Sequence, residues 1–146
     1  MDLILWRHAD AESGIPDEER RLTARGHDQA QRTAAWLKPR LPGATIVRTS
    51  PARRAQETAR ALTDAFEVCP EIATLATPVA ILEAAGWPDA PGAVVVVGHQ
   101  PTLGQALALA ITGRVADFHL ENGALCWLAR EGRRTRVRAL LPPDLI

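Results

Sequence analysis

The chain has 146 residues, 47% of them hydrophobic, which is enough for one domain with a substantial core. Its 17 basic and 17 acidic side chains cancel, so no general attraction draws it to nucleic acid or to an anionic membrane, and any anion site must be local. No stretch approaches the length of an apolar membrane span, and the N-terminus lacks the basic lead of a signal peptide. We therefore expect a cytoplasmic protein with a single domain over residues 1–146.

The first part of the chain predicts a strand, a polar loop and a helix. Residues 3–6 are apolar throughout, which is typical of a strand buried on both faces. A polar loop over residues 10–21 follows. Thr23 is a good N-cap for a helix that runs to about Lys38, where Pro39 ends it.

The middle of the chain predicts two further strands and two helices. Residues 45–47, with Arg48 at the end, form a short strand. Ser50-Pro51 starts a helix, because proline at the first helical position loses no needed N–H. Residues 67–69 are expected to form an edge strand, and a brief helix follows from Thr77-Pro78 to Gly86. The apolar stripe of the longer helix consists of Ala55, Ala59, Leu62 and Phe66.

The last part predicts a buried strand over residues 93–97, a helix from Pro101 to Gly113, and an antiparallel pair over residues 124–129 and 135–140. Strands that alternate with helices indicate an α/β fold. We expect a three-layer α/β/α sandwich whose sheet is mostly parallel, with the antiparallel C-terminal hairpin at one edge. The inner side of the last helix is expected to consist of Leu103, Leu107, Ala110 and Ile111.

Three arginines alternate with other residues on the last predicted strand: Arg134, Arg136 and Arg138. A row of arginine at a spacing of two is usually the solvated face of a strand. Nucleic-acid binding there is the weaker alternative, and we expect no nucleic-acid or membrane partner.

Polar residues directly follow three of the predicted strands. Arg7-His8 follows the first strand, residues 49–54 follow the second, and Gly98-His99 follows the strand over residues 93–97. In open α/β sheets, ligands bind beyond the carboxyl ends of the parallel strands. The three clusters are therefore expected to meet at one place.

Arg53 and Arg54 fall in the first turn of a predicted helix, where the helix dipole disfavours cations. A bound anion reverses that preference, because guanidinium groups and helix N-terminal amides then bind it together. We expect Arg53 to extend into solvent and Arg54 to face an anion.

A metal site is the main alternative, because His8-Ala9-Asp10 has a ligand-like spacing and His99 could join it. The neighbouring arginine disfavours this alternative, since a fixed cation repels a divalent one. We expect neither a metal nor another cofactor.

Nucleophilic catalysis on phosphorus fits these residues better. Neutral imidazole has one ring nitrogen free to attack, which makes His8 the candidate nucleophile. Arg7 and Arg54 can neutralise the phosphoryl oxygens, and His99 can stabilise the same oxygens as their charge redistributes.

Three blocks resemble signature motifs of the histidine phosphatase (phosphoglycerate mutase-like) superfamily. The first resembles its arginine-histidine signature, the second the block whose arginine, here Arg54, binds phosphate, and the third the block that supplies a second histidine, here His99. The resemblance spans about residues 1–112. The blocks read Leu5-Trp6-Arg7-His8-Ala9-Asp10, Ser50-Pro51-Ala52-Arg53-Arg54-Ala55-Gln56-Glu57-Thr58 and Val97-Gly98-His99-Gln100-Pro101.

The resemblance implies a phosphatase of the phosphoglycerate mutase-like fold whose catalytic residues are His8, Arg7, Arg54 and His99. Residues 22–26 are similar to the stretch before the first helix of the family, and Arg20 just ahead of them matches a position that often faces the phosphate pocket. Gln100, beside the second histidine, is a further candidate for substrate binding.

The short chain is most similar to the SixA-type phosphohistidine phosphatases, which lack the large insertion over the site. This likeness implies a phosphorylated protein partner, such as a histidine phosphotransfer domain. Larger members place an acidic proton donor after the second helix, where this chain offers only Glu71, out of clear register. A weak proton donor fits phosphohistidine better than a sugar phosphate, because its leaving imidazole needs less help. A phosphatase for small phosphate monoesters and a non-catalytic phosphate-binding module are the alternatives.

Overall fold

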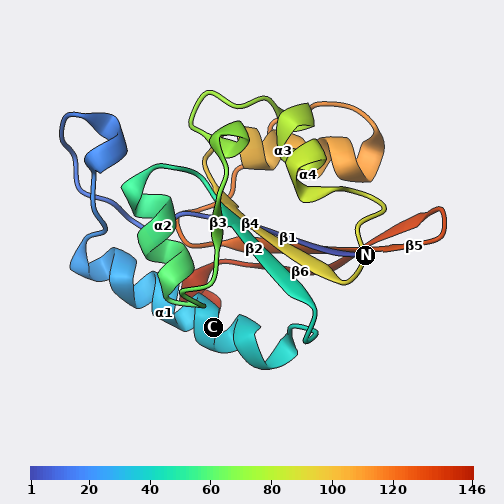
Figure 1. Ribbon diagram of the computed structural model, residues 1–146, viewed down its shortest axis with the longest axis horizontal. Coiled ribbons are helices and arrows are strands. Elements are labelled where there is room, and N and C mark those ends of the chain that lie inside the picture. The colour runs from blue at the N-terminus through green and yellow to red at the C-terminus, as the bar shows by residue number, and fades with distance from the viewer.

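The computed structural model describes all residues, 1–146, and is built on one six-stranded sheet (Figure 1). Its strands lie in the order β3-β2-β4-β1-β5-β6. The first four are mutually parallel, β5 is antiparallel to β1, and β6 is antiparallel to β5. The strands are β1 (Asp2–Arg7), β2 (Thr45–Thr49), β3 (Glu67–Val68), β4 (Ala93–Gly98), β5 (Leu125–Glu131) and β6 (Arg134–Leu141).

Helices cover both faces of this sheet, α1 and α2 on one side and α3 and α4 on the other (Figure 1). The predicted three-layer α/β/α sandwich with a C-terminal hairpin at one edge is confirmed. No helix has the length and hydrophobicity that crossing a membrane would require. The helices are α1 (Ala24–Leu37), α2 (Arg53–Arg60), α3 (Pro78–Ala85) and α4 (Thr102–Thr112), and short 3₁₀ turns are η1 (Asp17–Glu19), η2 (Lys38–Arg40), η3 (Pro70–Ile72) and η4 (Pro143–Leu145).

Strand β4 lies between β1 and β2, and every one of its residues is buried. Val94 and Val96 pack into the core beneath α3 and α4, whereas Val95 and Val97 pack into the core beneath α1 and α2. A strand with helices on both sides needs apolar side chains on both faces, and this requirement explains its uninterrupted hydrophobic sequence.

Helix α1 begins as predicted. The Thr23 side chain accepts a hydrogen bond from the Gly26 amide at 3.0 Å, and its hydroxyl donates to the Asp10 carboxylate at 2.7 Å. The cap therefore also ties the helix to the segment that follows β1. The inward residues Ala30, Ala34 and Leu37 are all buried.

Helix α2 is shorter than predicted at both ends. It begins at Arg53, not at Pro51, because the Ser50 amide still donates to the Val97 carbonyl of the neighbouring strand at 3.0 Å. The chain can turn into the helix only after that contact. The helix ends at Arg60, so the predicted stripe residues Leu62 and Phe66 pack from the following loop.

One residue of α4 also differs from the prediction, and the hairpin shows two details that the sequence did not indicate. Ile111 of α4 is exposed, and Ala106 takes the inner position instead. The β5–β6 pairing shifts in register between Trp127 and Leu128. Arg138 of β6 lies over the Trp127 ring, 4.4 Å from its centroid.

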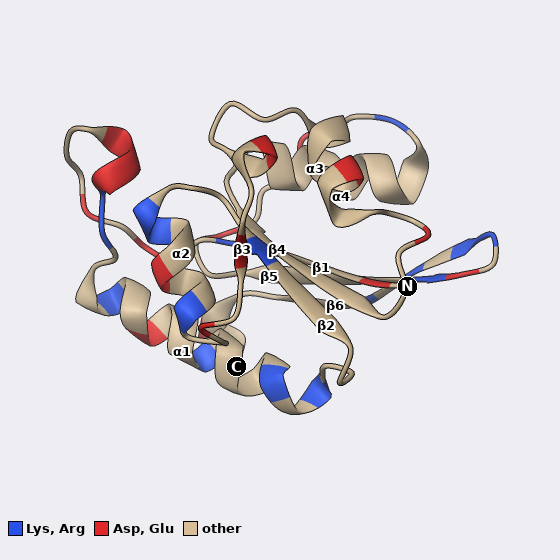
Figure 2. Cartoon of the chain, viewed as in Figure 1, with Lys and Arg blue, Asp and Glu red and all other residues tan.

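Basic and acidic residues both occur along the β5–β6 hairpin (Figure 2), and two of the β6 arginines form ion pairs. Arg136 pairs with Glu131 at 2.5 Å, and Arg138 pairs with Asp2 at 3.1 Å. All three arginines of the row are exposed, as the prediction of a solvated strand face requires.

A substitution at Gly26 tests whether the close packing of α1 against the segment after β1 stabilises the fold. A Cβ at Gly26 would clash with the Asp10 carbonyl, whereas a Cβ at Gly43 would meet no atom within 4 Å. We expect Gly26→Ala to destabilise the protein by about 1–3 kcal/mol, although alanine favours helices, because backbone must shift. Gly43→Ala should change stability by only about 0.5 kcal/mol. Urea unfolding measures both, and a Gly26→Ala protein as stable as the wild type would contradict this account.

Candidate active site

Three neighbouring parallel strands bring the predicted site residues to one edge of the sheet. His8 directly follows β1, His99 directly follows β4, and Arg54 lies in the first turn of the helix after β2. The two imidazole ring centroids are 5.2 Å apart, and the rings are tilted by 56°. Both rings are close enough to act on the same phosphoryl group.

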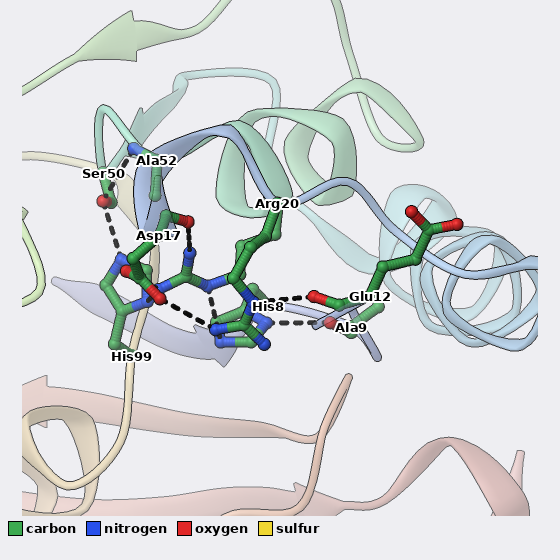
Figure 3. A network of polar contacts seen from close by, with 9 residues as sticks. His8, Ala9, Glu12, Asp17, Arg20, Ser50, Ala52 and His99 are labelled. Carbon is green, nitrogen blue, oxygen red and sulfur yellow. Dashed lines mark hydrogen bonds and ion pairs between the residues drawn. The ribbon is translucent and has the colours of Figure 1, made fainter. Parts of the chain in front are cut away.

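His8 has a defined tautomer. Its Nδ1 lies 2.8 Å from the Ala9 carbonyl oxygen, which can only accept a hydrogen bond, so Nδ1 carries the proton. Its Nε2 is therefore unprotonated, and its lone pair accepts the Arg54 Nε–H at 3.3 Å. Nε2 is thus the ring nitrogen that can act as a nucleophile once this hydrogen bond is exchanged (Figure 3).

The backbone around His8 is held from several sides. The His8 amide donates to the Gly98 carbonyl at 3.0 Å, and its carbonyl accepts from the Gly123 amide at 3.1 Å. The Ala9 amide donates to the Thr58 hydroxyl at 3.0 Å. These contacts fix the ring orientation, because they fix the carbonyl that binds Nδ1.

Arg54 is almost entirely buried, with 4% of its surface exposed. Besides its contact with His8, Nη1 donates to the Asp17 carbonyl at 2.8 Å, and Nη2 donates to the Asp17 carboxylate at 3.1 Å. Arg53, one residue earlier, is exposed, as predicted, and its side chain pairs with Glu57.

His99 is held between Arg54 and Ser50 (Figure 3). Its Nδ1 lies 3.4 Å from Arg54 Nη2, and its Nε2 lies 2.7 Å from the Ser50 hydroxyl. Arginine only donates, so Nδ1 accepts and Nε2–H donates to the hydroxyl.

Both histidines are buried, and burial disfavours the charged ring. Burial, together with the Arg54 and Arg7 charges, lowers the pKa of His8 to about 4, although the hydrogen bond to the Ala9 carbonyl opposes this shift. Burial likewise lowers the pKa of His99 to about 3, assisted by His8 and Arg54. Both rings are therefore neutral at neutral pH, the form that a nucleophile requires.

Two more arginines line the pocket that contains these rings. Arg7 Nη1 donates to the Leu120 carbonyl at 2.8 Å, while its buried Nε has no partner within the protein. Arg20 donates from Nε to the Glu12 carbonyl at 2.7 Å and from Nη1 to the Asp17 carboxylate at 2.9 Å. With Arg54, three guanidinium groups face one cavity of about 410 Å³.

The structure brings Gln100 to this pocket but not Glu71. The Gln100 side chain donates to the Phe118 carbonyl at 2.7 Å and accepts from the Gly104 amide at 2.8 Å, so both of its polar ends are engaged. Glu71 is exposed on η3, outside the residues that line the pocket.

Sequence reasoning missed three polar residues that line the pocket: Asp17, Thr74 and Asn122. Asn122 donates to the His8 carbonyl at 3.4 Å. Asp17 stands three residues before Arg20, an acid–base spacing that suits a 3₁₀ turn, and this spacing was the available signal. No three His, Cys, Asp or Glu side chains are grouped as metal ligands.

The sequence model of the histidine phosphatase superfamily (branch 1) matches residues 3–75, which include His8 and Arg54. The chain belongs to this superfamily. No curated protein sequence matches it significantly.

Several solved structures have a similar fold. The protein histidine phosphatase SixA, complexed with tungstate, aligns with a TM-score of 0.81 at 23% identity over 99% of each chain. A proposed phosphohistidine phosphatase SixA from Nakamurella multipartitia aligns at 0.78 and 26% identity, over 97% of this chain and 95% of that one. An H9A variant of phosphoserine phosphatase from Entamoeba histolytica, bound to phosphoserine, aligns at 0.72 and 15% identity over 95% of each chain.

The lowered histidine pKa values predict a specific pH dependence of stability. Folding favours the neutral form of each ring, so each histidine contributes to the free energy of unfolding. This contribution is complete above the pKa of the unfolded chain, about 6.5. It is lost as the pH falls from there through about 4 for His8 and about 3 for His99. NMR titration should find both rings still neutral at about pH 5 in the folded protein, and titrating near pH 6.5 in urea. A folded-state midpoint near 6.5 for either ring would contradict the geometry.

Proposed function

We propose that this protein removes the phosphoryl group from phosphohistidine in another protein, through a covalent intermediate on His8. The observation that carries the proposal is the position of His8 Nε2, whose lone pair meets the Arg54 guanidinium group at 3.3 Å in a pocket lined by two further arginines. A nucleophile and a cluster of cations suit a phosphoryl group, whose negative charge otherwise repels attack.

In the first step His8 Nε2 attacks phosphorus, a new N–P bond forms, and the P–N bond to the substrate imidazole breaks. The leaving ring departs with the bonding electrons and is neutral if its other nitrogen already carries a proton. The phosphorylated His8 ring becomes positively charged, and the Ala9 carbonyl, bound to Nδ1–H at 2.8 Å, stabilises that charge.

In the second step a water molecule attacks the same phosphorus from the pocket side. The N–P bond breaks, its electrons return to Nε2, and phosphate leaves with both protons of the water. His8 is again a neutral imidazole with its proton on Nδ1. Arg7, Arg54 and Arg20 neutralise the phosphoryl oxygens in both steps, and His99 stands beside the same oxygens.

The shortage of a proton donor favours phosphohistidine over an ester. Hydrogen bonds from Arg20 and Arg54 hold the pKa of the Asp17 carboxyl below its usual value, so this group is an anion at neutral pH. The Asp10 carboxylate accepts from Thr23 and is tied to the cap of α1. An alkoxide leaving group needs a proton that neither carboxyl is placed to give, whereas an imidazole leaving group needs less help.

The openness of the site also favours a protein substrate. Between α2 and β4 the chain has only β3, η3 and α3, so no large insertion covers the strand ends. The similarity in fold to SixA, a protein histidine phosphatase, supports the same conclusion.

A phosphatase for small phosphate monoesters is the second candidate. The fold is also similar to that of a phosphoserine phosphatase, and a cavity of about 410 Å³ is large enough for a small phosphorylated molecule. A non-catalytic phosphate-binding module is less well supported, because both histidines and the arginines are present together.

A substrate panel separates these functions. We expect a phosphorylated histidine phosphotransfer domain to be hydrolysed with a kcat/KM well above those of phosphoserine and an aryl phosphate, and chelators to have no effect. Phosphate release from each substrate measures this preference. Faster hydrolysis of a small ester than of the phosphorylated domain would favour the second candidate.

Replacement of the nucleophile tests the mechanism itself. His8→Ala should lower kcat by about 10³-fold or more, because it removes the atom that forms the covalent bond. His27→Ala is the matched control, since His27 is an exposed histidine of α1 outside the pocket, and it should keep wild-type activity. Full turnover by His8→Ala would eliminate the proposed intermediate.

A further inference from the structure

Asp17 occupies the place where the proposed mechanism needs an anion. It lies on η1, in the loop that folds back over the strand ends, and its carboxylate sits between two cations of the pocket (Figure 3). One carboxylate oxygen accepts from Arg20 Nη1 at 2.9 Å, and the other accepts from Arg54 Nη2 at 3.1 Å. The same two guanidinium groups line the cavity beside His8.

The donors of Arg54 are nearly all in use. A guanidinium group has five N–H donors. In this structure Nε meets His8, Nη1 meets the Asp17 carbonyl, and Nη2 meets both the Asp17 carboxylate and His99. Attack of His8 Nε2 on phosphorus frees the Nε–H of Arg54, because the lone pair then points to phosphorus. The phosphoryl group can therefore gain a two-point contact at Nε and Nη2 only if one acceptor of Nη2 also withdraws.

The Asp17 carboxylate is the acceptor that can withdraw most easily. Its side chain is 55% exposed, whereas His8 and His99 are 7% and 5% exposed and held by further contacts. The two arginines are the only hydrogen-bond partners of its carboxylate. Because the Asp17 backbone carbonyl also binds Arg54 Nη1, the loop can stay in place while the side chain turns into solvent.

We propose that Asp17 is an exchangeable internal ligand of the phosphoryl site, which holds Arg54 and Arg20 in the free enzyme and yields them to the oxygens of the incoming phosphoryl group. This inference rests on the proposed function, because it takes the Arg54 pocket as the phosphoryl site. Binding is then an exchange of one anion for another at fixed cations, and the affinity for any tetrahedral oxyanion is reduced by the competing carboxylate.

Removal of the carboxylate should therefore strengthen oxyanion binding. We expect Asp17→Ala and Asp17→Asn both to bind inorganic phosphate about tenfold more tightly than the wild type, as measured by calorimetry. The alanine variant is needed beside asparagine, because an asparagine amide can itself donate to phosphate. Glu18→Gln is the matched control: it removes one negative charge from the same turn, makes none of these contacts, and should bind phosphate nearly as the wild type does.

The outcomes separate this inference from the proposed function. If the wild type binds phosphate and the Asp17 variants bind it equally or more weakly, Asp17 supports the arginines instead of competing for them, and the inference is wrong. If Glu18→Gln tightens binding as much as Asp17→Ala, the effect is one of general charge, which also overturns it. If neither the wild type nor the variants bind phosphate, the pocket is not an oxyanion site and the proposed function fails too.

Discussion

The buried guanidinium group of Arg54 is the constraint on which the site depends. A cation that is 4% exposed has lost most of its hydration, and such a charge is costly unless acceptors surround it. Its acceptors here are two imidazole nitrogens and two oxygens of Asp17. The fold therefore assembles around a charge that requires acceptors, and this requirement suits the pocket to the phosphoryl group that we propose as its ligand.

The same burial sets the state of the nucleophile. Hydrophobic strands that end beneath α2 and α4 place His8 and His99 in a poorly hydrated environment, which lowers both pKa values and keeps the rings neutral. The Ala9 carbonyl then selects the tautomer by accepting from Nδ1. The neutral charge state of both histidines and the tautomer of His8 therefore depend on the positions at which β1 and β4 end.

Much of the fold could be predicted from the sequence because its strongest signals are local. The fully apolar segment at β4 identifies a central strand, and the carboxyl-end rule for parallel sheets brings His8 and His99 together without further information. The start of α2 was misjudged because it depends on a hydrogen bond between Ser50 and Val97, residues far apart in the sequence.

The contact between Asp17, in the polar loop over residues 10–21, and Arg54 was not predicted, because it too joins residues far apart in the sequence. Asp17 belongs to a segment with no hydrophobic periodicity, and its spacing of three from Arg20 is the one local signal. Its contact with Arg54 crosses 37 residues of chain, and that spacing does not indicate it. Glu71 was chosen only because it lies near the position of the family's acidic donor, without clear register, and the structure places it on the exposed surface of η3. Carboxylates in loops are the residues for which sequence position is least informative, because tertiary contacts decide where they point.

The most direct test of this account is the identity of the atom that carries phosphorus during turnover. The enzyme should be quenched with alkali, which preserves phosphohistidine, and the phosphorylated peptide analysed by mass spectrometry and by NMR of phosphorus and nitrogen. The account predicts phosphorus on Nε2 of His8, the nitrogen left free by the Ala9 carbonyl. Phosphorus on Nδ1, on another residue, or on no residue during active turnover would contradict it.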